Sequence, residues 1–134
     1  MGKVFYLMNV SLDGYVEDVN GSIEFTAPAA DVFSLATEYV RQASAFLFGR
    51  RHEVMEKPWT AAAQKDDLPP LEMEFAQLYV KTPRIAFSDT LESVPNGLRL
   101  VRSKDAVAEV KRLKEETKGY CNWAAPAWPR RLWI

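Results

Sequence analysis

The stretch Ser44–Glu53, Ser-Ala-Phe-Leu-Phe-Gly-Arg-Arg-His-Glu, decides the fold of this chain. Its apolar run from Ala45 to Gly49 is typical of a buried strand, and the polar residues that follow predict that a helix begins directly after it. A glycine at such a turn lets the backbone approach a ligand closely. The unpaired N–H groups of the helix, together with the guanidinium groups of Arg50 and Arg51, would favour an anion such as phosphate. The alternative interpretation is a solvated basic turn that ends a core strand.

Composition places the chain among ordinary one-domain proteins, because 134 residues with 48% hydrophobic residues suffice for a core. The 17 basic and 18 acidic residues nearly cancel, so we expect neither nucleic acid nor an anionic membrane as partner. No apolar run approaches the roughly 20 residues that span a bilayer, and no signal peptide is visible, which predicts a cytoplasmic protein. With one cysteine, Cys121, and one histidine, His52, we expect no intrachain disulfide and no metal site.

The first strand is expected at Lys3–Val10, where β-branched and aromatic residues follow one another without alternation. Such a run predicts a central strand that is covered on both faces. Polar side chains at its carboxyl end, Asn9, Ser11 and Asp13, are well placed to meet a ligand. Asp13 precedes a glycine, so the alternative is that its carboxylate simply bonds the backbone of its own turn.

Helical and extended patterns alternate along the rest of the chain. The apolar spacing predicts a helix after Pro28 whose inward face holds Val32, Leu35, Ala36, Tyr39, Val40 and Ala43. A short helix should follow the Gly49 strand and end near Pro58, and another should span 71–79. Strands are expected at 84–87 and 98–101, before a helix that Asp105 caps. This order predicts an α/β fold with a mostly parallel sheet and helices on both faces.

Several motifs together resemble the dihydrofolate reductase-like family, in the branch of the riboflavin-biosynthesis reductase domain (RibD C-terminal domain-like). The resemblance covers about residues 3–118. It implies a three-layer α-β-α reductase, incomplete at the C-terminal end, that binds NADPH and transfers hydride to a small heterocyclic substrate. The motifs that carry it are Met8-Asn9-Val10-Ser11-Leu12-Asp13-Gly14-Tyr15, Phe48-Gly49-Arg50-Arg51-His52-Glu53, Pro58-Trp59 and Phe87-Ser88-Asp89-Thr90-Leu91.

The resemblance also implies roles for individual residues. The cofactor-binding set is Gly49, Arg50, Arg51, His52, Ser88, Asp89 and Thr90, and the substrate-binding set is Asn9, Ser11, Asp13 and Trp59. Asp13 and Asp31 are the candidate catalytic acids, although an acid at a helix start more often complements the helix dipole.

Two positions depart from the family pattern, since His52 stands in place of a threonine and Asp89 in place of a basic residue. A carboxylate beside an adenosine ribose repels a 2′-phosphate and accepts a hydrogen bond from a 2′-hydroxyl. The chain therefore has NADH as a possible cofactor besides NADPH.

The last sixteen residues, 119–134, break the pattern. They hold three of the four tryptophans and the only cysteine, and they show neither strand nor helix periodicity. The family has here a strand followed by a Gly-Gly motif that cradles the pyrophosphate. Codons compatible with this tail, read one base out of register, spell Leu-Gln-Leu-Gly-Gly-Pro-Gly-Leu. We therefore expect a domain over 1–118 and an out-of-frame tail over 119–134; the alternative is a genuine tail whose tryptophans pack on the core or on a partner.

Two functions remain open. The first is an NAD(P)H-dependent reductase of the dihydrofolate reductase or 5-amino-6-(5-phosphoribosylamino)uracil reductase type. The second is a catalytically impaired, truncated remnant that only binds a nucleotide or anion. An incomplete sheet leaves an open edge and uncovered apolar surface, so we expect a homodimer or higher oligomer that uses the Trp-rich tail.

Overall fold

The computed structural model describes residues 2–118 and 120–123, and within them it has one five-stranded sheet. The strands are β1 (Lys3–Tyr6), β2 (Ala43–Phe48), β3 (Arg84–Phe87), β4 (Leu98–Val101) and β5 (Tyr120–Trp123). Their order across the sheet is β1-β5-β2-β3-β4, and each neighbouring pair is parallel. The expected α/β class with a mostly parallel sheet is confirmed.

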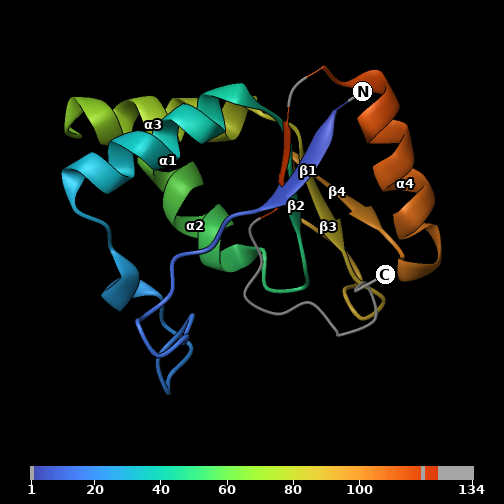
Figure 1. The fold of residues 1–134 in the computed structure, drawn as a ribbon, viewed down its shortest axis with the longest axis horizontal. Coiled ribbons are helices and arrows are strands. Elements are labelled where there is room, and N and C mark those ends of the chain that lie inside the picture. The colour runs from blue at the N-terminus through green and yellow to red at the C-terminus, as the bar shows by residue number, and fades with distance from the viewer. Residues whose placement is uncertain (1, 119, 124–134) are drawn as a thin grey trace.

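Helices cover both faces of this sheet, which gives the expected three layers (Figure 1). Helices α1 (Ala30–Gln42), α2 (Glu53–Ala62) and α3 (Pro70–Lys81) lie on one face, and α4 (Ser103–Glu116) lies on the other. A short 3-10 helix, η1 (Glu24–Thr26), precedes α1. No helix in the described part of the chain has both the length and the apolar character needed to cross a bilayer.

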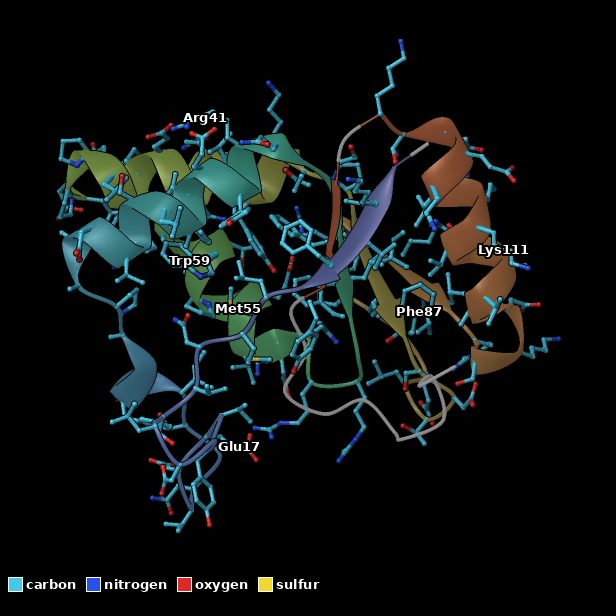
Figure 2. The ribbon with its side chains drawn as sticks, in the orientation of Figure 1. Glu17, Arg41, Met55, Trp59, Phe87 and Lys111 are labelled. Carbon is cyan, nitrogen blue, oxygen red and sulfur yellow. The ribbon has the colours of Figure 1, made fainter. Side chains whose placement is uncertain are left out.

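Strand β2 joins two hydrophobic clusters because its side chains alternate between the faces of the sheet. Ala45 and Leu47 pack toward α4, in the cluster that also contains Phe87 (Figure 2). Phe46 and Phe48 pack toward the three-helix face. A continuous apolar run is the pattern of a strand covered on both sides, so the expectation for residues 45–49 is confirmed.

Strand β1 is at the edge of the sheet and not at its centre, so that expectation was wrong. It is only four residues long, and Val4 and Tyr6 remain 37% and 61% exposed. An apolar run shows that a strand has apolar surface on both faces, but it does not show that the protein covers them. The central place beside β2 is taken by β5.

The tail contains a strand, which corrects the prediction that nothing after residue 118 is regular. Residues Tyr120–Trp123 form β5, which pairs with β1 on one side and with β2 on the other. The backbone supplies these ladder bonds whatever the side-chain pattern, so four residues without alternation can still pair. The rest of the tail, residues 124–134, and its expected part in an oligomer lie outside the described residues.

Helix α1 buries only part of the face that its apolar spacing predicts, since Val40 is buried as expected. Thr37 and Val40 are buried, whereas Val32, Leu35 and Tyr39 are 49%, 57% and 38% exposed. The helix packs against α3 as well as against the sheet. Helix α2 also differs from expectation, because it continues through Pro58 to Ala62.

Candidate functional site

The predicted anion-binding turn connects β2 to α2 at the carboxyl edge of the sheet. Gly49 is buried, and its carbonyl accepts the N–H of His52 at 3.2 Å. The N–H groups of Val54 and Met55 donate to the carbonyls of Arg51 and His52, each at 3.1 Å. The start of α2 therefore offers fewer free donors than expected.

Arg50 and Arg51 are neighbours in sequence but have different surroundings. Arg51 forms an ion pair with Glu17, and its Nη2 donates to the carbonyl of Gly21 at 3.0 Å. Arg50 is exposed and makes no hydrogen bond or ion pair with any residue the structure describes. Within the described part of the chain, Arg50 is thus the guanidinium without a partner, while Arg51 holds the loop that contains Glu17.

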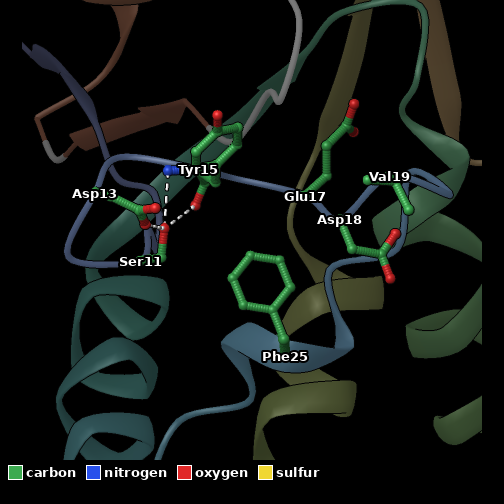
Figure 3. A pocket seen from close by; sticks show the side chains of 7 residues that line it. All are labelled: Ser11, Asp13, Tyr15, Glu17, Asp18, Val19 and Phe25. Atoms are coloured by element: carbon green, nitrogen blue, oxygen red, sulfur yellow. Dashed lines mark hydrogen bonds between the residues drawn. The ribbon is translucent and has the colours of Figure 1, made fainter.

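That loop forms one wall of an open hollow of about 550 Å³. In Figure 3 the ring of Phe25 lies between two groups of lining residues. The Ser11 hydroxyl donates to Asp13 at 2.6 Å and accepts the N–H of Tyr15 at 2.9 Å. The full lining is Ser11, Asp13, Tyr15, Glu17, Asp18, Val19 and Phe25.

The loop that follows the Met8–Tyr15 motif therefore contacts the Gly49 turn through the Arg51–Glu17 pair. Ser11 and Asp13 line the hollow. The Asp13 carboxylate accepts a hydrogen bond from the Ser11 side chain, whereas the alternative interpretation expected a backbone donor. Asn9 is exposed between β1 and this loop and does not line the hollow. The Asp13 carboxylate can accept hydrogen bonds from the donors of a polar ligand, and the Ser11 hydroxyl can bind either a donor or an acceptor.

The predicted motif Phe87–Leu91 begins where β3 ends, next to the end of β2. The buried Ser88 hydroxyl accepts the N–H groups of Thr90 and Leu91, both at 3.2 Å. Nη1 of Arg102 donates to the carbonyls of Ser88 and Leu91 at 3.0 and 2.7 Å. The polar groups of this motif are thus largely used to close its own turn.

Asp89 has a structural partner that the sequence did not suggest. Its Oδ1 accepts the N–H of Ser103 at 2.9 Å, which caps the first turn of α4 from outside the helix. This hydrogen bond lowers the pKa of the Asp89 carboxyl. Arg102 is the N-cap residue of α4 and Asp105 lies inside its first turn, so the prediction that Asp105 caps the helix was wrong.

Asp31 and Trp59 lie away from the hollow. Asp31 is exposed in the first turn of α1, where its Oδ1 accepts the N–H of Val32 at 2.9 Å. The Trp59 ring packs within the helical layer, 4.2 Å from the Phe75 ring and 5.9 Å from the Phe33 ring between centroids (Figure 2). These surroundings fit a helix-dipole acid and a packing residue, and the structure does not bring either one to Ser11 or Asp13.

A buried polar network next to the turn was not predicted. Oε2 of Glu56 accepts the Tyr79 hydroxyl at 2.8 Å and Nε of Arg84 at 3.0 Å. Nη1 of Arg84 donates to three carbonyls at the end of α3, those of Tyr79, Val80 and Thr82. Burial, and then the nearby Glu56 carboxylate, raise the pKa of Tyr79.

His52 belongs to the margin of this network. It is buried, and its Nδ1 has no hydrogen-bond partner in the described part of the chain; the same is true of Oε1 of Glu56, one helical turn further on. The helical bond from the Glu56 N–H to the His52 carbonyl, 2.9 Å, places the two side chains on one face of α2. The four-residue spacing of His52 and Glu56 could have suggested that they share a helix face, but it could not have shown that both side chains are buried. Across the described residues, no group of three acidic, histidine or cysteine side chains is suited to a metal ion.

Comparison with solved structures supports this fold. The chain is similar to a crystal structure described as a putative riboflavin biosynthesis protein from Shewanella sp. PV-4, with a TM-score of 0.56 and 19% identity. The match covers 92% of this chain and 64% of that protein, so the chain spans about two thirds of its length. A likeness at this identity supports the riboflavin-biosynthesis-like fold. No family model and no curated protein matches the sequence.

Proposed function

We propose that this chain binds a nicotinamide dinucleotide at the carboxyl edge of its sheet and uses it to reduce a small heterocyclic substrate. The observation that supports this most is the meeting of two segments at one edge. The turn after β2 brings the guanidinium of Arg50, which has no partner among the described residues. The stretch with Ser11 and Asp13 borders an open hollow, and Arg51 links the two. Ligands of parallel α/β sheets bind in this position, beyond the carboxyl ends of the strands.

In this proposal Arg50 binds the pyrophosphate of NADPH, with Gly49 permitting close approach of the backbone. A guanidinium group suits this task because its donors match the geometry of phosphate oxygens. Ser11 and Asp13 face the substrate and the nicotinamide. The dinucleotide supplies the hydride, and the protein supplies binding and orientation.

The choice between NADPH and NADH turns on Asp89. A carboxylate that caps α4 is held by Ser103 and is less available to a ribose hydroxyl. We therefore keep NADPH as the cofactor, with NADH as the alternative. Binding titrations with NADPH and with NADH distinguish the two cofactors. Tighter binding of NADH would mean that Asp89 binds the ribose hydroxyl after all.

The test measures cofactor binding and cofactor oxidation on the same sample. We expect Arg50→Gln to weaken NADPH binding about tenfold, the loss of one charge-assisted hydrogen bond. Arg99→Gln is the matched control, since Arg99 is an exposed arginine within β4. Equal NADPH affinity in the parent chain and in Arg50→Gln would refute the proposed site.

A second candidate is a module that binds the dinucleotide or an anion without turnover. It is favoured by the donors already used within the site, namely those of Arg51 and of the first turn of α2. NADPH binding without oxidation, across pteridine and pyrimidine substrates, would select this function over the reductase.

A further inference from the structure

We propose that the loop of residues 11–22 is an internal competitor for the anion site: its Glu17 carboxylate occupies Arg51, and a bound phosphate group displaces it and releases the loop. The inference rests on the proposed function for the identity of the natural phosphate-bearing ligand. The contact between loop and turn is independent of that identity.

The first support is the set of contacts that Arg51 makes. Nη1 pairs with Oε2 of Glu17 while Nη2 donates to the Gly21 carbonyl at 3.0 Å, so both outer nitrogens are engaged by one loop. The side chains of Arg51 and Glu17 are 26% and 32% exposed. The pair is thus sheltered from much of the solvent, and a dissolved anion can still reach it.

The second support is that the loop is shaped to fit this arginine. Gly21 has φ of +77°, and a Cβ on it would lie 3.0 Å from Nη2 of Arg51, so a larger residue there is strained and crowded. Oδ1 of Asp18 accepts the N–H groups of Asn20 and Ser22 at 2.8 and 2.9 Å. The turn that presents the Gly21 carbonyl is therefore held in shape before it meets Arg51.

The third support is chemical. A carboxylate and a phosphate use the same guanidinium donors, so Glu17 and a ligand phosphate compete for Arg51. Arg50, the adjacent residue, has no such partner among the described residues and can bind the anion first. Once the phosphate takes Arg51 as well, the loop loses its main contact with the β2–α2 turn.

Release of the loop changes the hollow. Glu17, Asp18 and Val19 line it, so movement of this segment moves one wall. Anion binding at the turn is thereby coupled to the shape of the space beside Ser11 and Asp13. The coupling works in both directions, since a ligand that holds the loop in place weakens anion binding equally.

The experiment measures hydrogen exchange in residues 15–22 and the affinity for inorganic pyrophosphate. The variant Glu17→Gln removes the competing charge, and Glu24→Gln, an exposed acid in η1, is the matched control. We expect Glu17→Gln to raise exchange in the loop and to bind pyrophosphate about threefold to fivefold more tightly, the range of a partly exposed ion pair. In the unmodified chain, saturating pyrophosphate should raise loop exchange as well.

Three results would overturn the inference: equal pyrophosphate affinity in the two variants, slower loop exchange with pyrophosphate in the unmodified chain, or no binding to either the unmodified chain or Glu17→Gln. The proposed function fails separately. If pyrophosphate releases the loop but the protein does not oxidise NADPH, the reductase function is refuted and the competition by Glu17 is retained. If the protein oxidises NADPH but pyrophosphate does not change hydrogen exchange in the loop, the reductase function is retained and the competition by Glu17 is refuted.

Discussion

Replacing Glu56 with glutamine tests whether the buried Glu56–Arg84 pair stabilises the helical layer. Both side chains are almost fully buried, 3% and 6% exposed. The pair joins α2 to β3 and, through Tyr79, to α3. Gly97 makes room for it, because a Cβ there would lie 2.5 Å from Nη2 of Arg84.

The expected cost follows from what each substitution leaves behind. Breaking a buried ion pair costs about 3–5 kcal/mol, since the remaining charge loses its partner. Glu56→Gln leaves Arg84 with its three carbonyl acceptors, so we expect about 3 kcal/mol. Arg84→Met leaves a buried carboxylate whose Oε1 already has no described partner, and we expect about 4–5 kcal/mol. The double variant should cost about 2 kcal/mol less than the sum, because it buries no charge.

Urea denaturation, followed by circular dichroism and by tryptophan fluorescence, measures these differences. Trp59 is a useful reporter because it packs in the cluster that α2 contributes to. Glu53→Gln is the matched control: Glu53 is exposed on the same helix and pairs with Lys57 at 2.7 Å, so its replacement should leave the urea midpoint nearly unchanged. Equal costs for Glu53→Gln and Glu56→Gln, or strictly additive costs in the double variant, would refute the reasoning.

Three further predictions concern the rest of the chain. Asp89→Ala should destabilise the start of α4. Because the Ser103 N–H lowers the pKa of the Asp89 carboxyl, the stability that this cap contributes should be present above the usual carboxyl pKa and lost as pH falls. Thermal melts in which the parent chain and Asp89→Ala show the same pH dependence would contradict the cap. Hydrogen bonds from Arg112 and Arg99 lower the pKa of Glu109 to about 2 from 4.5, so the free energy of unfolding should fall as pH drops from 4.5 to about 2. In acid titrations of stability, Glu109→Gln should reduce the loss of stability over this pH range. Among the described strands β1 is at the sheet edge, and Leu35 is exposed, so we expect self-association. Leu35→Glu should shift the mass measured by light scattering toward that of the monomer, and a monomeric parent chain at micromolar concentration would contradict this prediction.

The layered α/β fold could be predicted because its signals are local. The run from Ala45 to Gly49 predicts a strand with apolar surface on both faces, and the polar residues after it predict where a helix begins. Strand β5 could not be predicted in this way. Its place between β1 and β2 depends on which backbone edge is free to pair, and no residue within Tyr120–Trp123 carries that information.

The candidate site was predictable in its position but not in its internal bonding. Residues at the ends of β2 and β3 meet because those strands are parallel neighbours, which the element order already implies. The order of helices and strands cannot show which polar side chains form hydrogen bonds within the protein itself. The partner of Asp89 is fourteen residues away at Ser103, and the partner of Arg51 is Glu17 in another loop. Glu56, on a helix that looks amphipathic, is buried only because Arg84 and Tyr79 reach it from other elements.

The arginine pair shows how one residue type can serve the fold and the ligand at once. A motif of two arginines predicts an anion site with two guanidinium groups, yet Arg51 already has a carboxylate and a carbonyl partner. An incoming phosphate gains from Arg51 only the difference between its own contacts and those of Glu17, while it gains the full contact with Arg50. Arg50→Gln should therefore weaken anion binding more than Arg51→Gln, and Arg51→Gln should loosen the loop more than Arg50→Gln. Equal effects of the two substitutions on both properties would mean that the loop contact has no part in the site.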